Sequence, residues 1–136
     1  QEGFYIVYLF NSDMSGVYLS LNQGWTQYER EYGTKEGRVE IKKNANYSKT
    51  LLKSDQGFSY APINLKATKS LGKGYELGNI CSTYYDAKEI PQEEDLIDDL
   101  RNLIGVYREL KGLVGSDILD IKGQLNEDVF QEEIHG

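Results

Sequence analysis

Two short runs near the start of the chain consist largely of strand-forming residues. Residues 3–10 are mainly aromatic or aliphatic, and residues 17–22 place Val17, Leu19 and Leu21 on one side. A period of two is typical of a strand with one buried face. The positions between the runs hold small polar residues and end in a glycine, a composition typical of turns. The pattern therefore predicts a β-hairpin.

The more polar stretch that follows predicts two helices separated by a glycine. Thr26 can cap the first helix, residues 27–32, because Glu29 lies three residues later as a capping-box partner. Gly33 then ends this helix. The second helix is expected over residues 35–53, with a sparse apolar face and exposed lysines.

The central part of the chain is expected to alternate loops with short strands. Residues 54–61 and the glycine- and lysine-rich residues 68–74 are expected to be loops. Strands are expected over residues 63–67, where Pro62 suits an edge, and over residues 77–85.

The clearest helix covers residues 92–110, where apolar residues recur every three or four positions. Pro91 suits the start of this helix, and Gly112 and Gly115 are expected to end it. Together these elements predict an α+β fold, with a small mixed or antiparallel sheet, flanking helices and a long C-terminal amphipathic helix.

The chain has 136 residues, the size of one ordinary domain. We expect a single domain over residues 1–114, truncated at its N-terminus, and an acidic tail or linker over residues 115–136. No apolar stretch approaches the roughly 20 residues that span a bilayer. No targeting segment is visible either, so we expect a cytoplasmic protein without a membrane partner.

Charge is unevenly distributed along the chain. The net charge is −7, but residues 35–75 hold nine basic and three acidic side chains, and residues 82–136 hold five basic and fourteen acidic ones. A basic middle region can present a positive face to a polyanion, or it can be the solvated face of a helix. Because an acidic chain repels DNA at long range, any DNA binding should be local and strongly salt-dependent.

The composition leaves little room for catalysis. A single cysteine, Cys81, and a single histidine, His135, exclude a disulfide framework and Cys- or His-rich metal sites. Cys81 has apolar neighbours in a predicted strand, so we expect it to be buried and unreactive. The acidic residues 93–99 fit the solvated face of a helix. We therefore expect no catalytic residue, metal or cofactor, although an enzyme with metal-dependent cleavage remains a third hypothesis.

The glycines around Lys73 do not form a nucleotide-binding motif. A P-loop has Ser or Thr after its Gly-Lys pair, but Gly74 follows Lys73. The dinucleotide fingerprint fails as well, because Leu77 stands where its third glycine belongs. We expect instead a flexible basic loop that lets a ligand such as phosphate approach the backbone closely.

Eleven tyrosines make up most of the aromatic residues. Tyrosine offers a flat face for stacking and a hydroxyl for hydrogen bonding, as a pocket for a nucleobase requires. The alternative is the ordinary preference of tyrosine for β-sheets. Tyr75 is an exception, since it follows the Gly-Lys-Gly loop, where an aromatic residue is less expected to belong to the hydrophobic core.

Three blocks of the sequence resemble the N-terminal specificity domain of McrB-type, modification-dependent restriction proteins (the MrcB N-terminal family). They read GFYIVYLF at residues 3–10, GVYLSLNQG at residues 16–24 and LGKGYELGNI at residues 71–80. The helix at residues 91–110, which ends in YREL, is similar as well. The blocks occur in the order found in the family, and the resemblance covers residues 3–111.

The resemblance implies an α+β DNA-binding domain whose partner is a downstream NTPase motor or nuclease, as a domain or subunit. It further implies recognition of methylated cytosine by flipping the base into an aromatic pocket, whose residues correspond to Tyr5, Leu9 and Tyr75. Two family features precede the first strand, a residue that fills the vacated stack and a tryptophan after an Ile-Pro pair. This sequence has no counterpart of either.

Two main hypotheses of function follow. The first is a specificity module for antiphage defence that binds modified double-stranded DNA. Its base pocket would be formed by Tyr5, Leu9 and Tyr75. Its phosphate contacts would be Lys42, Lys43, Lys49, Lys69 and Lys73. The second is a protein-interaction or assembly module of a defence complex, in which the acidic C-terminal part docks a partner.

Overall fold

A computed structural model describes residues 3–53 and 57–118. The strands are β1 (Phe4–Phe10), β2 (Gly16–Gln23) and β3 (Cys81–Asp86). The helices are α1 (Trp25–Leu51), α2 (Ser70–Gly78) and α3 (Glu93–Ile118). The predicted α+β class is confirmed.

The three strands form an antiparallel sheet in the order β1-β2-β3. The predicted hairpin is present, and its register pairs Phe4 with Gln23 and Phe10 with Val17. Because side chains alternate along a strand, this register sorts the residues of β2 into two faces. Leu19 and Leu21 lie on one face, and Tyr18, Ser20 and Asn22 lie on the other.

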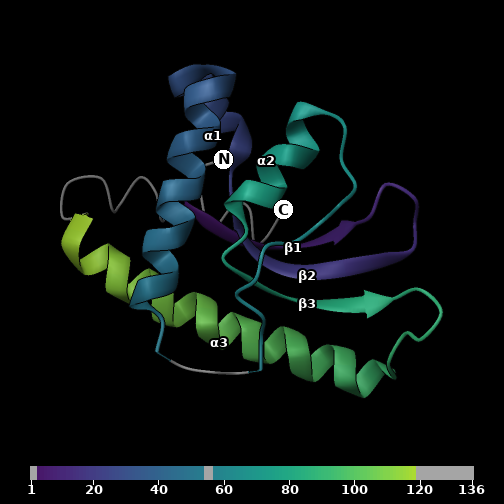
Figure 1. Ribbon diagram of the computed structural model, residues 1–136. Coiled ribbons are helices and arrows are strands. Elements are labelled where there is room, and N and C mark those ends of the chain that lie inside the picture. Colours follow the sequence, from purple (N-terminus) through teal and green to yellow (C-terminus); the bar gives the residue numbers. More distant parts are fainter. Residues whose placement is uncertain (1–2, 54–56, 119–136) are drawn as a thin grey trace.

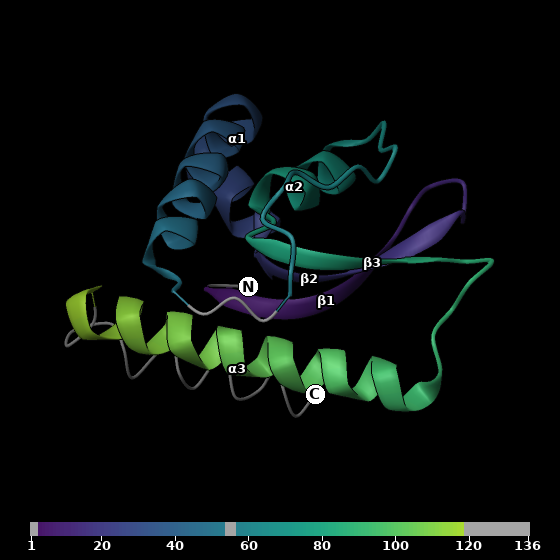
Figure 2. The same ribbon diagram turned by 60° about the horizontal axis from the view of Figure 1, so that its bottom comes forward.

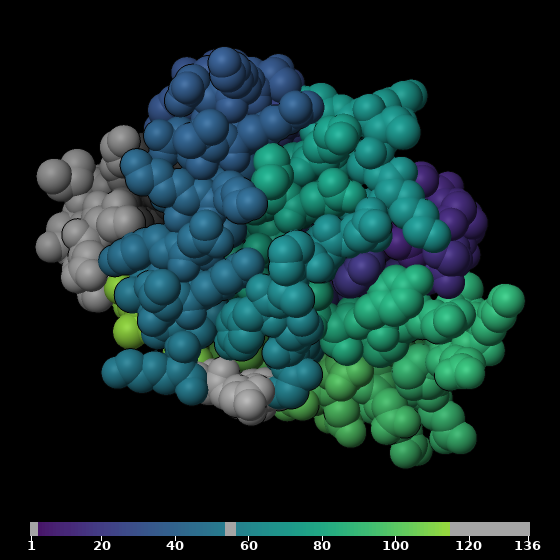
Figure 3. Space-filling model, in the orientation of Figure 1, coloured from purple at the N-terminus to yellow at the C-terminus, as the bar shows by residue number. Residues whose placement is uncertain are grey.

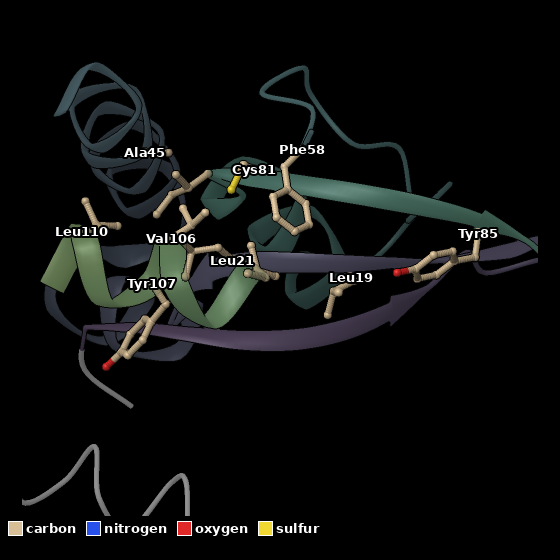
Figure 4. Packing of buried hydrophobic residues seen from close by; sticks show 11 residues of the cluster. Leu19, Leu21, Ala45, Phe58, Cys81, Tyr85, Val106, Tyr107 and Leu110 are labelled. Carbon is tan, nitrogen blue, oxygen red and sulfur yellow. The ribbon is translucent and has the colours of Figure 1, made fainter. Parts of the chain in front are cut away.

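The sheet lies between two layers of helix, with α3 on one side and α1 and α2 on the other (Figures 1 and 2). On the α3 side, Leu103, Val106 and Leu110 pack against Leu19 and Leu21, and all five side chains are almost fully buried. Figure 4 shows this cluster, which Ala45 of α1 and Phe58 join. The apolar periodicity of α3 thus gives the sheet its main core.

The opposite face of the sheet has a smaller apolar cluster. Leu9 of β1 is buried there with Ile63 and Leu65, and Tyr18 and Tyr75 pack against them with part of their surface exposed. Ile63 and Leu65 belong to the irregular segment before α2. This segment therefore covers the end of the sheet that carries the hairpin loop, and α2 lies beside it toward the other end (Figure 1).

The predicted strand over residues 63–67 is wrong. Before this point in the chain, Ser59 forms an isolated antiparallel β-bridge with Ser82 of β3. The segment then crosses the face of the sheet, which buries Ile63 and Leu65 against Leu9. Lys66 has a φ of 56°, a left-handed conformation that a strand does not accommodate.

The predicted glycine-rich loop is also wrong, because residues 70–78 form α2, and the strand expected over residues 77–85 begins only at Cys81. The glycines of α2 allow close helix packing instead of backbone flexibility. A Cβ added at Gly74 would lie 2.2 Å from the Trp25 ring, and one at Gly78 would lie 2.8 Å from Ile41 Cδ1. Burial of the Trp25 ring against α2 compensates for the low helix propensity of glycine.

The prediction that Gly33 separates two helices is confirmed, because α1 consists of two helical segments that meet at this non-helical residue, whose φ is 82° and ψ 175°. The predicted start of the first helix is wrong. The N-cap is Gly24 and not Thr26, because Trp25 is already helical and buried. Glu29 accepts hydrogen bonds from Thr34 and from Ser70 of α2, so it does not form a capping box.

The predicted end of the C-terminal helix at Gly112 and Gly115 is wrong too, since α3 continues to Ile118. Glycine costs a helix only about 1 kcal/mol, and Val114 still packs against the core. The part of the predicted acidic tail beyond Ile118 lies outside the described residues.

The close contact at Gly74 gives a test of the fold. We expect Gly74→Ala to lower the free energy of unfolding by about 1–3 kcal/mol, because a methyl group there overlaps the Trp25 ring. Gly105→Ala is the matched control, since Gly105 lies in α3 with nothing within 4 Å of the added Cβ. It should stabilise the domain by up to about 1 kcal/mol. Equal effects of the two variants in urea unfolding would contradict this packing.

Candidate functional site

An open pocket of about 360 Å³ lies on the side of the sheet opposite α3. It is lined by Leu9, Phe10, Ser12, Leu65, Ala67, Thr68, Lys69, Leu71, Gly72 and Tyr75. β1, the hairpin loop, the segment before α2 and α2 itself all contribute to it. Figure 3, in the orientation of Figure 1, shows α1 in blue and α2 with its preceding segment in teal.

The structure brings together the three residues predicted to form a base pocket. Leu9 and Tyr75 both line the pocket. Tyr5 lies beside Tyr75 in an edge-to-face contact, with ring centroids 6.5 Å apart and ring planes at 72°. Tyr5 thus supports Tyr75 from the side, and Tyr75 and Phe10 are the aromatic residues among those that line the pocket.

This geometry determines what the pocket can accept. Tyr5 and Tyr75 cannot sandwich a flat group between them, because their ring planes meet at 72° and are not parallel. The walls are largely apolar, through Leu9, Leu65 and Leu71, with the exposed Lys69 among the lining residues. The pocket therefore suits a flat, partly apolar group that stacks on one ring and carries a nearby negative charge.

Buried polar side chains hold Tyr75 in place. Asn22 Nδ2 donates a hydrogen bond to the carbonyl oxygen of Tyr75 at 2.9 Å and another to Ser20 Oγ at 3.0 Å. Gln23 Nε2 donates to the carbonyls of Ile41 and Gly78. These bonds connect the end of β2 to both α1 and α2, so the backbone that carries Tyr75 is anchored to the sheet.

The five predicted phosphate-binding lysines fall into two groups. Lys69 is the N-cap of α2, and Lys73 donates its backbone N–H to the Lys69 carbonyl at 3.1 Å, so the two lie one turn apart. Lys42, Lys43 and Lys49 are on α1. Lys42 and Lys49 are seven residues apart and share a side of this helix, whereas Lys43 projects about 100° away from Lys42.

Lys49 differs from the other four lysines because it is half-buried. Burial, and to a lesser extent the nearby charge of Lys42, lower the pKa of the Lys49 ammonium below its usual value. A phosphate beside Lys49 would oppose this lowering of the pKa, since a nearby anion stabilises the charged form.

Charge is separated across the sheet. Up to Val114, α3 carries six acidic and three basic side chains, whereas α1 on the other side carries six basic and four acidic ones. Three of the five predicted lysines belong to α1, Lys73 belongs to α2 and Lys69 is the N-cap of α2. Both helices lie on the side of the sheet away from α3 (Figure 2). The lysine-bearing side is therefore the side of the pocket.

The described residues offer few groups for other chemistry. Cys81 is buried, and desolvation raises the pKa of its thiol to about 12. Tyr85 donates its hydroxyl to Asp99 at 2.6 Å, and burial followed by this hydrogen bond raises the pKa of Tyr85. Within residues 3–53 and 57–118, no three His, Cys, Asp or Glu side chains converge on a metal-sized site. In the same part of the chain, no helix is both long and apolar enough to cross a bilayer.

Several pocket residues were not predicted from the sequence. Leu65 and Ala67 were assigned to a strand, and Leu71 and Gly72 were assigned to a loop. Their contribution depends on where the segment before α2 crosses the sheet. The apolar residues within an otherwise polar stretch were the one sequence signal that could have indicated them.

The chain matches the family model described as the MrcB-like, N-terminal domain, over residues 1–112. The resemblance identified from the three sequence blocks is therefore confirmed. No curated protein and no solved structure matches the chain.

Burial of Cys81 predicts a thiol that is silent in the folded domain. At pH 8 we expect a disulfide reagent to label Cys81 only after denaturant is added, because the reactive thiolate is suppressed. The unfolded thiol ionises near pH 8.5, below its folded pKa. The free energy of unfolding should therefore fall as the pH rises above about 8.5. Rapid labelling of the native domain would contradict this placement of Cys81.

Proposed function

Since the chain belongs to the MrcB-like N-terminal domain family, we propose that it is the DNA-binding specificity module of a modification-dependent restriction system. The family itself is that of a non-catalytic N-terminal module of McrB-like restriction proteins. We further propose that the module recognises methylated cytosine in double-stranded DNA. Cleavage and nucleotide hydrolysis would belong to a downstream motor or nuclease.

One observation carries the proposal for the base: Leu9 and Tyr75 line the same pocket, with Lys69 beside them, on the lysine-bearing side. A flipped cytosine would stack on Tyr75 and place its methyl group against the apolar walls. Base–aromatic stacking contributes about 1–3 kcal/mol, and flipping costs a few kcal/mol. Stacking therefore offsets much of the flipping cost, and contacts to phosphate would supply the remaining affinity.

The lysines would contribute affinity without sequence preference. Phosphate contacts position a protein on the duplex, and contacts with the base specify what is recognised. Lys69 and Lys73 would hold the backbone near the flipped nucleotide. Lys42, Lys43 and Lys49 on α1 would extend the contact along the duplex.

The direct test is fluorescence anisotropy of this chain with matched duplexes, measured at two salt concentrations. The duplexes carry cytosine, 5-methylcytosine, 5-hydroxymethylcytosine or 6-methyladenine. We expect the 5-methylcytosine duplex to bind most tightly at both concentrations. Salt-sensitive binding without preference would contradict base recognition. No binding at low salt, together with a stable oligomer in light scattering, would favour the assembly module.

Tyr75→Ala tests the stacking contact. We expect this variant to lose preference for the modified duplex by about 5- to 100-fold, in line with the loss of one base–aromatic stack. Its affinity for unmodified DNA should change little. Tyr47→Ala is the matched control, because Tyr47 is an exposed tyrosine on α1, outside the pocket. Equal preference in the two variants would contradict the role assigned to Tyr75.

The double variant Lys42→Ala/Lys43→Ala tests the phosphate contacts. It should weaken binding to modified and unmodified duplexes equally and reduce the slope of log K against log salt by about 1.8, or 0.9 per phosphate contact. Lys88→Ala is the control, since Lys88 is an exposed lysine in the turn after β3. A loss of base preference with an unchanged salt slope would contradict this assignment.

A further inference from the structure

One wall of the pocket is an irregular segment, residues 63–67, which we call the strap. The strap has no helix or strand of its own, yet it contributes Leu65 and Ala67 to the pocket lining. Ile63 and Leu65 fasten it to Leu9 through apolar contacts. The position of this wall therefore depends on contacts with neighbouring elements and not on a local hydrogen-bond ladder.

The hairpin loop holds the strap on one side. Asn11 Nδ2 donates to the Asn64 carbonyl at 2.8 Å, and the Ser12 N–H donates to the Leu65 carbonyl at 2.9 Å. Lys66 forms an ion pair with Asp13, with Nζ and Oδ2 2.6 Å apart. The hairpin loop and the strap are about 53 residues apart in sequence, so these bonds fix a long-range contact.

α2 holds the same strap on the other side, through Glu76. Glu76 Oε2 accepts a hydrogen bond from the Leu65 N–H at 2.7 Å. Both backbone polar groups of Leu65 are therefore bonded, the N–H to Glu76 and the carbonyl to Ser12. Glu76 directly follows Tyr75, so this bond fixes the spacing between two pocket walls, Leu65 and Tyr75.

We propose that Glu76 is a positioning residue that sets the selectivity of the pocket by holding Leu65 in place relative to Tyr75. This inference rests on the proposed function. A pocket distinguishes one methyl group by about 10- to 200-fold, and only when its walls fit closely. Dispersion contacts weaken steeply when a gap of 0.5–1 Å opens. A strap released from Glu76 would still bound the pocket but would discriminate poorly between methylated and unmodified bases.

The pair Glu76→Ala and Glu76→Gln isolates this hydrogen bond. Both variants remove the same charge, so both change general DNA affinity equally, but glutamine keeps an oxygen that can accept the Leu65 N–H. We expect Glu76→Ala to lower the ratio of affinities for methylated and unmodified duplexes by about tenfold. Glu76→Gln should retain most of that ratio. The amide of Leu65 should exchange faster with solvent in Glu76→Ala than in Glu76→Gln.

A second variant tests the hairpin side. Asp13→Asn keeps an oxygen for the Ser15 N–H but loses the charge that pairs with Lys66. Asp13→Asn should lower the ratio of affinities for methylated and unmodified duplexes less than Glu76→Ala does. The exposed Lys66–Asp13 ion pair contributes less than the part-buried hydrogen bond between Glu76 and Leu65. Thermal unfolding of each variant checks that the domain remains folded.

The outcomes separate this inference from the proposed function. A wild-type domain without base preference would overturn both. A preference that is present in the wild type, lost in Tyr75→Ala and retained in Glu76→Ala would overturn the positioning role alone. Equal losses in Glu76→Ala and Glu76→Gln would overturn it as well, since the hydrogen bond would then not be the cause.

Discussion

The end of β2 joins the sheet to both helices that cover it, and the candidate site depends on this junction. Asn22 and Gln23 are buried, and their side-chain amides donate to carbonyls of α1 and α2. Tyr28 of α1 completes the junction by donating its hydroxyl to Gln23 Oε1 at 2.8 Å. A buried polar group left without its partner costs about 1–3 kcal/mol. The alternative placements of α1 and α2 would leave several such groups unpaired.

This junction explains why the two faces of the sheet differ. The face toward α3 is an apolar core, whose contacts have no fixed direction. The other face is held by directional hydrogen bonds at one end and by the hairpin loop at the other. The pocket lies between these two anchors, so its walls come from segments that are separately fixed. Such support is what a specific binding site requires.

Charged side chains also differ between the two sides of the sheet. The acidic side chains of α3 lie across the sheet from the lysines of α1 and α2. A net charge of −7 is therefore compatible with a locally positive side, because screening limits each charge to about 10 Å at ordinary salt. The family match and this separation together favour DNA over a basic protein partner on the pocket side.

The sequence by itself determined the hairpin, the amphipathic α3 and the family, because each is encoded locally, by side-chain periodicity or by contiguous blocks. It also indicated Tyr5, Leu9 and Tyr75, although only through the family resemblance. Tertiary structure decided the rest. The glycines of α2 suggest a loop until Trp25 and Ile41 are packed against them. Leu65 joins Tyr75 at the pocket because the strap crosses the sheet, where it packs against Leu9 and is hydrogen-bonded to Glu76 and the hairpin loop. These are contacts between residues far apart in the chain, and a local sequence pattern does not predict them.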